Sequence, residues 1–229
     1  MRPLLLVAAV AAVATAQPSV SVSGLAAIPQ GEFADALDAV GGGLSVGAFY
    51  AVPGSPVALG LEGAASLYGY ERREVPLSLT IPDVRVGVAT SNNLVQGLAV
   101  LRLQVPSGGV RPYADAVGGL SYLFTETSVG DDDFYSDYGE PLSSTNFDDL
   151  ALVYGGGAGV LVTLHRGFSD EGRPTSVALD ARVRYLVGGQ ATYLGRGDID
   201  RFTDGTIDLY PRTSRTDLLV PYLGVSFSF

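Results

Sequence analysis

The sequence has no cysteine, no tryptophan and no lysine, and it contains a single histidine. The missing cysteines exclude disulfides, a thiolate zinc site and a cysteine nucleophile. One histidine is too few for most imidazole metal sites and acid–base pairs. All 14 basic residues are arginine, and with 24 acidic residues they give a net charge of −10. That charge argues against a nucleic-acid partner, because no basic stripe is available to neutralise phosphates.

Long apolar runs are confined to the beginning of the chain. Arg2 is followed by an apolar run over 4–14 and by the small residues Ala14-Thr15-Ala16. This pattern predicts a secretory signal peptide over 1–16, cleaved after Ala16, and a single domain over 17–229. The run is too short to cross a bilayer as a helix, which takes about 20 residues. We therefore expect an exported protein without a membrane helix.

The rest of the sequence alternates between apolar and more polar residues with a period of two, which is typical of β-strands. In the stretch 177–187, for example, Asp180, Arg182 and Arg184 share one face and apolar or aromatic residues share the other. Only the short segment 33–39 has the spacing of a helix. We predict eight strands, at 18–28, 41–52, 57–70, 93–105, 110–126, 149–164, 177–194 and 217–229.

The connections between these strands include tight turns and long polar loops. Turn-forming residues occupy 53–56 and 106–109, whereas polar stretches occupy 71–92, 127–148 and 195–216. A soluble barrel would carry many charges on its outer face. Here the polar faces are small and sparsely charged, which suits a narrow lumen, and the apolar faces suit lipid, which strands cross only as a closed barrel. The predicted fold is an all-β, eight-stranded antiparallel up-and-down transmembrane β-barrel.

The chain ends in alternating apolar residues that lead to Phe227 and Phe229, and glycine- and tyrosine-containing strands occupy 110–122 and 154–160. In these segments the chain resembles the small outer-membrane β-barrel family, of the OmpA transmembrane-domain and OmpX type. The resemblance implies a monomer in the bacterial outer membrane, in contact with outer-membrane lipid. It also implies that the outer-membrane assembly machinery reads the last strand, with Phe227 and Phe229 as its signal.

Six charged residues fall on inward-facing positions of the predicted strands. They are Glu62, Arg102, Asp115, Asp180, Arg182 and Arg184. Charges in a narrow, low-dielectric interior must be paired, and the planar guanidinium of arginine suits bidentate contact with a carboxylate. We interpret the six residues as a structural ion network that fills the lumen. The alternative is a small gated pore.

Two further features bear on catalysis and metal binding. Barrel enzymes that modify lipid A are similar to this chain in size and use a Ser/His pair with an acid. Here His165 is followed two residues later by Gly167 rather than serine, and it falls at the short-turn rim, so we predict no catalytic residue. The acidic stretches 131–140 and 148–149 lack the spacing of a calcium loop. We predict neither a metal site nor a cofactor.

These observations favour a non-enzymatic outer-membrane β-barrel with a structural or surface-interaction role, carried by long extracellular loops. A lipid-A-modifying barrel enzyme and a small passive channel are the alternatives. No motif in the loops identifies a ligand.

Overall fold

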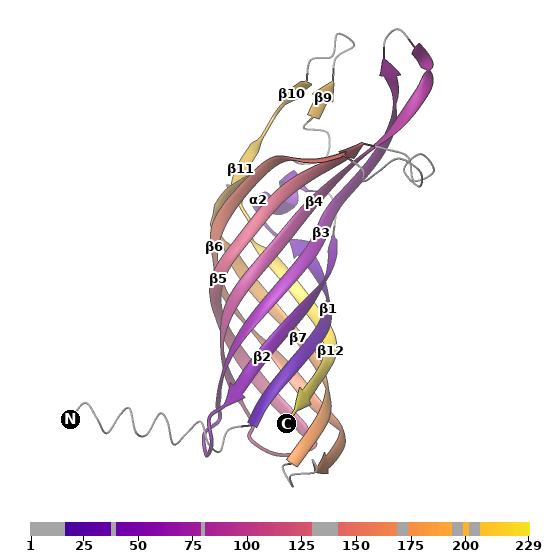
Figure 1. Cartoon of the computed structure of the whole chain (residues 1–229). Coiled ribbons are helices and arrows are strands. Elements are labelled where there is room, and N and C mark those ends of the chain that lie inside the picture. Colours follow the sequence, from indigo (N-terminus) through magenta and orange to yellow (C-terminus); the bar gives the residue numbers. More distant parts are fainter. Residues whose placement is uncertain are drawn as a thin grey trace, which may run out of the picture.

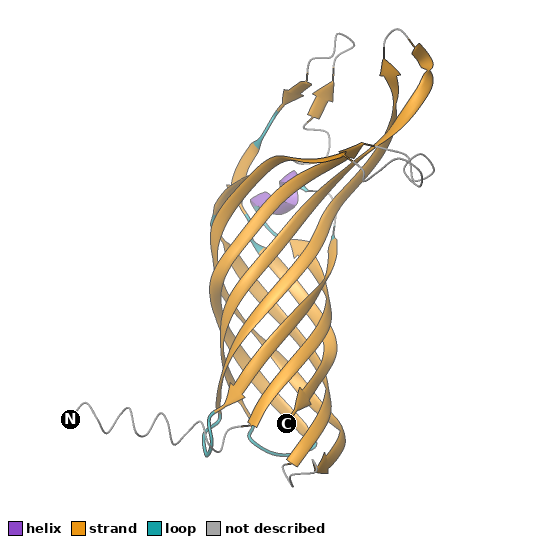
Figure 2. Cartoon of the chain, viewed as in Figure 1, coloured by secondary structure: helices purple, strands orange, loops and turns teal. Residues whose placement is uncertain are grey.

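The computed structural model describes residues 17–37, 40–78, 81–129, 142–168, 174–193, 199–201 and 207–229. The predicted signal peptide, residues 1–16, lies outside these ranges. The described residues form a closed antiparallel β-barrel, which confirms the predicted fold (Figures 1 and 2). Within these ranges no helix is both long enough and apolar enough to cross a membrane.

Eight long strands build the barrel. They are β1 (Gln17–Pro29), β2 (Gly41–Ala51), β3 (Val57–Ser78), β4 (Ile81–Gln104), β5 (Val110–Val129), β6 (Leu142–Phe168), β7 (Pro174–Gly188) and β12 (Leu218–Ser228). Their order around the barrel is β1-β12-β7-β6-β5-β4-β3-β2. The last strand pairs with the first from Ser19↔Ser228 to Pro29↔Leu218, so no long edge is left open.

Five short elements lie toward the end of the barrel opposite the tight turns. They are α2 (Glu32–Ala36), β8 (Gln190–Tyr193), β9 (Ile199–Arg201), β10 (Ile207–Leu209) and β11 (Arg212–Arg215). The β2–β3 and β4–β5 turns lie at the other end, together with the start of β1 and the end of β12 (Figure 1). We call these the long-hairpin end and the short-turn end.

The predicted loop at 71–92 is instead a continuation of the barrel strands. β3 and β4 remain paired from Val57↔Leu103 to Ser78↔Ile81, and β5 and β6 remain paired as far as Val129↔Leu142. A strand outside a membrane has water on both faces and needs no apolar alternation. The sequence pattern therefore ended before the strands did.

The predicted strand 177–194 was wrong at its end, because β7 leaves the barrel after Gly188. The N–H of Gly188 donates to Asp217 Oδ1 at 3.0 Å, and the N–H of Gly189 donates to the carbonyl of Leu152 at 2.7 Å. Residues 190–193 then pair with β11 rather than continuing the barrel wall. Within the predicted loop 195–216, β9 pairs with β10.

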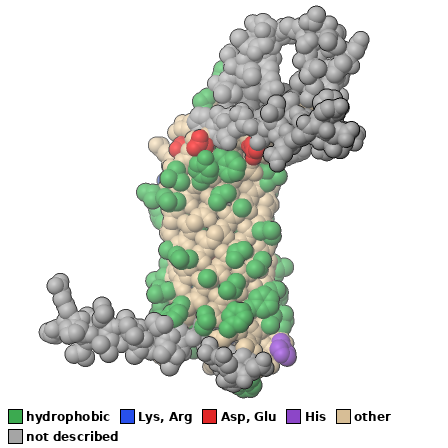
Figure 3. All heavy atoms as spheres, in the orientation of Figure 1, with side chains coloured by type: hydrophobic (Ala, Val, Ile, Leu, Met, Phe, Trp, Pro, Cys, Tyr) green, Lys and Arg blue, Asp and Glu red, His purple; other side chains and the backbone are tan. Residues whose placement is uncertain are grey.

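The two faces of the barrel strands differ as the alternation predicted. Leu44, Leu61 and Leu152 point outward and are 65%, 70% and 72% exposed, whereas the interleaved Ser45 and Glu62 are buried. Apolar side chains are spread over the barrel wall on the face shown in Figure 3, and the acidic side chains visible there lie near the long-hairpin end. The barrel is therefore apolar outside and charged inside, the reverse of a soluble protein.

Candidate functional site

The lumen holds the six charged residues that the alternation placed on the inward face. Glu62 comes from β3, Arg102 from β4 and Asp115 from β5, and Asp180, Arg182 and Arg184 follow one another on the inward face of β7. Each is at most 6% exposed. The structure brings all six together as one connected set of ion pairs.

Asp115 is the centre of one half of this network. Arg102 is its cross-strand partner and binds it in a bidentate manner, with Nε 2.8 Å from Oδ1 and Nη2 3.0 Å from Oδ2. Arg184 Nη2 approaches the same Oδ2 at 2.7 Å. One buried carboxylate therefore accepts hydrogen bonds from two guanidinium groups, and these bonds are of the strong, charge-assisted kind.

Glu62 links that half to the other. Its Oε1 accepts from Arg184 Nη1 and its Oε2 from Arg182 Nη2, both at 2.8 Å. Arg182 Nη1 also donates to Asp180 Oδ2 at 2.9 Å, and the hydroxyl of Tyr113 donates to Asp180 Oδ1. Three acids and three arginines thus alternate along a single series of ion pairs, and their formal charges cancel.

The Glu62 contacts span the barrel. β3 and β7 are separated by three strands in either direction around the closed order, so they lie on opposite walls. An ion pair of 2.8 Å between Glu62 and Arg182 leaves no open passage between those side chains. At this level the lumen is filled, as expected for a barrel of eight strands.

Aromatic rings and glycines shape the space around the arginines. The guanidinium carbon of Arg102 lies 3.6 Å from the ring centre of Tyr113 and 4.4 Å from that of Phe49, and Arg182 lies 4.3 Å from that of Tyr222. These are cation–π distances. Sequence reasoning did not identify these three aromatic residues, although each occupies an inward position of its strand.

Two glycines of β6 make room for this packing. A side chain at Gly157 would place its Cβ 2.7 Å from Arg184 Cγ, and one at Gly159 would place it 2.5 Å from the ring of Tyr113. The glycine-rich stretch 155–159 therefore leaves the β6 wall bare where side chains from β5 and β7 need the volume.

A second obstruction lies at the long-hairpin end, where α2 packs against inward-facing side chains. Phe33 is 1% exposed, and its ring centre lies 5.1 Å from that of Tyr193 in an edge-to-face arrangement and 6.0 Å from that of Tyr68. Leu37 and Leu123 belong to the same buried apolar cluster. We call α2 and these partners the apolar cap. The sequence indicated the helix spacing of this segment but not its place.

The remaining predicted features lie away from the lumen. His165 is exposed near the short-turn end of β6, and Phe227 and Phe229 are 41% and 54% exposed on the outer face and end of β12.

The acidic stretches are the last of these features. Residues 131–140 lie outside the described ranges. Of the acidic pair that follows, Asp148 accepts from the Tyr122 hydroxyl at 3.1 Å, and Asp149 accepts from the Thr192 N–H at 2.7 Å. Among described residues, no group of three or more His, Cys, Asp or Glu is placed to hold a metal.

Comparisons with known proteins give likenesses in fold to solved structures, among them the following two. No family model matches the chain, and no curated protein matches it in sequence. The chain is similar to Ail, the attachment invasion locus protein of Yersinia pestis, which was solved in complex with the heparin analogue sucrose octasulfate. The sequence identity is 13%, the match covers 93% of this chain and 99% of Ail, and the TM-score is 0.37. It is also similar to Neisserial surface protein A, at 14% identity over 93% and 94% of the two chains, with a TM-score of 0.41. Neither likeness carries a function over to this chain.

Proposed function

We propose that this protein is a closed outer-membrane β-barrel without enzymatic activity, and that it acts through the surface of its long-hairpin end. The observation that carries this proposal is the filled lumen. The ion network joins opposite walls through Glu62, and the apolar cap buries Phe33 nearer the long-hairpin end. A barrel whose lumen is filled is expected to meet its partners at its exposed ends.

Residence in a membrane is supported by the apolar exterior. The outward side chains of the barrel strands include leucines more than half exposed, and lipid is the solvent in which such a surface is stable. The strands are long enough as well, since about 9–11 residues cross a bilayer when tilted and the shortest barrel strands have 11.

The same lengths indicate where surface contacts are made. β3, β4, β5 and β6 have 22, 24, 20 and 27 residues, so they extend well beyond the crossing. Roughly ten extra residues at about 3.3 Å each give hairpins that project clear of the membrane. Among the described residues, the connections at the short-turn end are the tight β2–β3 and β4–β5 turns. We therefore assign the interaction surface to the β3–β4 and β5–β6 hairpins.

The rival functions have less support. A channel requires an open lumen, which the Glu62 ion pairs close. A lipid-A-modifying enzyme requires an activated nucleophile near the outer leaflet, whereas His165 lies at the short-turn end and Gly167 holds the place of the motif serine. The absence of enzyme activity is tested by mass spectrometry of lipid A from cells with and without the protein. A modified lipid A would contradict it.

Export and assembly belong to the same proposal. Cleavage after Ala16 would release the mature domain, 17–229, and the outer-membrane assembly machinery would read the last strand through Phe227 and Phe229. The exposed ring of Phe227 on the strand that closes the barrel, and that of Phe229 directly after it, support this role. The inserted barrel is proposed to be a monomer that contacts outer-membrane lipid.

The absence of cysteine allows a direct test of location and orientation. Thr213 is exposed at the long-hairpin end and Ser107 is exposed at the short-turn end. With a bulky, membrane-impermeant maleimide, intact cells that make Thr213→Cys are expected to label. Cells that make Ser107→Cys are expected to label only after the outer membrane is permeabilised. Labelling of Ser107→Cys on intact cells, or recovery of the protein in the soluble periplasm, would overturn the proposal.

A further inference from the structure

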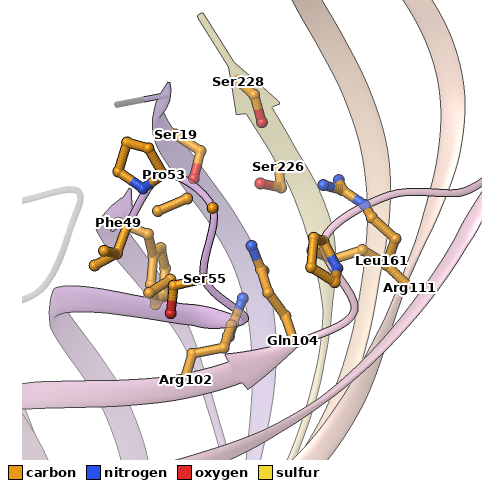
Figure 4. A pocket seen from close by; sticks show the side chains of 15 residues that line it. Ser19, Phe49, Pro53, Ser55, Arg102, Gln104, Arg111, Leu161, Ser226 and Ser228 are labelled. Carbon is orange, nitrogen blue, oxygen red and sulfur yellow. The ribbon is translucent and has the colours of Figure 1, made fainter. Parts of the chain in front are cut away.

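A cavity of about 240 Å³ opens at the short-turn end of the lumen, below the ion network. The β2–β3 turn and the β4–β5 turn form part of its wall, and β1 and β12 form another part (Figure 4). Its volume is below the usual range for drug-sized ligands and large enough for a small ion with several waters.

The lining of the cavity is basic and rich in hydroxyl groups. Arg102, which Asp115 holds, and the unpaired Arg111 are its basic residues, and none of the described residues that line it is acidic. Gln104, Ser19 and Ser226 add amide and hydroxyl donors. In Figure 4 the Gln104 side chain projects between the two walls, and Ser226 and Arg111 both belong to the lining of the cavity.

Arg111 differs from the arginines of the ion network. Each of those binds at least one buried carboxylate, whereas Arg111 has no ion-pair partner in the described part of the chain, and its buried Nε has no hydrogen-bond partner there. Arg111 lines the same cavity as Arg102. Because Asp115 neutralises Arg102, Arg111 is the uncompensated cation among the described residues of this lining, and an unpaired, half-buried cation favours an anion as its partner.

We propose that this cavity binds a small oxyanion, either inorganic phosphate or a carboxylate, with Arg111 as its main cationic partner and Ser226 and Gln104 as hydrogen-bond donors. A guanidinium matches the oxygens of both anions. Arg102 forms the inner side of the cavity while Nε and Nη2 hold Asp115, so the bound anion lies next to the ion network. The inference rests on the proposed function at one point: the proposed orientation makes the periplasm the compartment from which the anion enters.

Calorimetric titration of the purified barrel in a nonionic detergent tests the inference. The titrants are inorganic phosphate and, separately, acetate, at constant ionic strength in a buffer free of both. We expect saturable binding of at least one of them, weakened roughly tenfold or more in Arg111→Gln, because a charge-assisted hydrogen bond contributes about one to two orders of magnitude in affinity. Arg215→Gln is the matched control, since it removes the same charge at the long-hairpin end, and it should bind as the wild type does.

Ser226→Ala keeps every charge and gives a second reading that does not depend on the folding of Arg111→Gln. It should weaken binding several-fold. Saturable heat with phosphate alone assigns a phosphate site, and with acetate alone a carboxylate site. No saturable heat with either anion would overturn the inference, as would equal losses in Arg111→Gln and Arg215→Gln. Because the titration uses detergent-solubilised protein, its result is independent of the cell-labelling test of the proposed function.

Discussion

At the residue scale, Arg182 shows how the lumen network is balanced. Its guanidinium donates to Glu62 and Asp180 at once, and Glu62 is held by Arg184 as well. Asp180 has no other ion pair among the described residues. A charge buried in this way is tolerated because its partners satisfy it. Removing one partner therefore lowers the free energy of unfolding by more than the ion pair itself contributes to it.

Arg182→Leu is therefore expected to destabilise the barrel by about 3–5 kcal/mol, because Asp180 is left buried with only the Tyr113 hydroxyl as partner. Urea unfolding in lipid vesicles measures the free energy. Adding Asp180→Asn should recover part of the loss, since the stranded charge is removed too. A neutral effect of Arg182→Leu would show that the network does not hold the lumen together.

Val183, next along β7, tests the opposite face. Its side chain points outward and is 44% exposed. Val183→Arg places a charge against hydrocarbon and is expected to cost about 2–4 kcal/mol near the middle of the bilayer and less near its surfaces. Urea unfolding in lipid vesicles again measures the free energy, and Val183→Leu, which keeps an apolar side chain at this position, is the control. If the arginine variant is as stable as the leucine variant, this face of β7 does not meet lipid.

At the element scale, α2 is short, and tertiary packing holds it in place. Its five residues make too few internal hydrogen bonds for independent stability. Its place is fixed instead by Phe33 in the apolar cap and by neighbouring backbone contacts, such as the Gln30 N–H to the carbonyl of Asp217 at 2.9 Å.

Phe33→Ala is expected to loosen the apolar cap and leave the barrel wall intact, because the lost ring contacts involve Tyr68 and Tyr193 while the strand pairing is unaffected. Hydrogen exchange should become faster over residues 32–37 and stay slow in β1 and β2. Val40→Ala, which changes an exposed residue between the same two strands, is the control. Unchanged hydrogen exchange over residues 32–37 would contradict the anchoring role of Phe33.

The terminal strand supports a second prediction at this scale. β12 closes the barrel against β1, and the N–H of Phe229 donates to the carbonyl of Pro18 at 3.0 Å. Deletion of Phe229 is expected to lower the yield of inserted barrel and to cause periplasmic accumulation, as judged by fractionation and heat-modifiable gel migration. Phe229→Tyr keeps the aromatic ring and should insert normally. Equal yields for the deletion and the wild type would contradict the assembly role.

How far the sequence predicts each element depends on the solvent around it. Where lipid and lumen impose opposite demands on adjacent residues, as at Arg182 and Val183, the alternation identified the faces correctly. It placed the six charged residues in the lumen without determining which acid pairs with which arginine, because pairing depends on the barrel's shear and closure. The extended hairpins were missed because the apolar alternation of the sequence stops before the pairing of β3 with β4 and of β5 with β6 does. The cap was missed because nothing local shows that Phe33 meets Tyr193, from a distant part of the chain.

At the scale of the whole molecule, the central claim is that the barrel is closed. Two independent layers fill it, a neutral ion network between opposite walls and an apolar cap at the long-hairpin end, and its oxyanion cavity lies below the network. A closed barrel with an apolar exterior makes the projecting hairpins the interaction surface in the proposed function.

The measurement that tests this claim most directly is the conductance of purified wild-type protein in a planar lipid bilayer. The account predicts no discrete opening at moderate voltage, with traces that match those of protein-free bilayers given the same detergent. Insertion is verified separately by heat-modifiable migration of the reconstituted protein. Steady conductance steps of uniform size, growing in number with the amount of inserted protein, would contradict it and identify a pore.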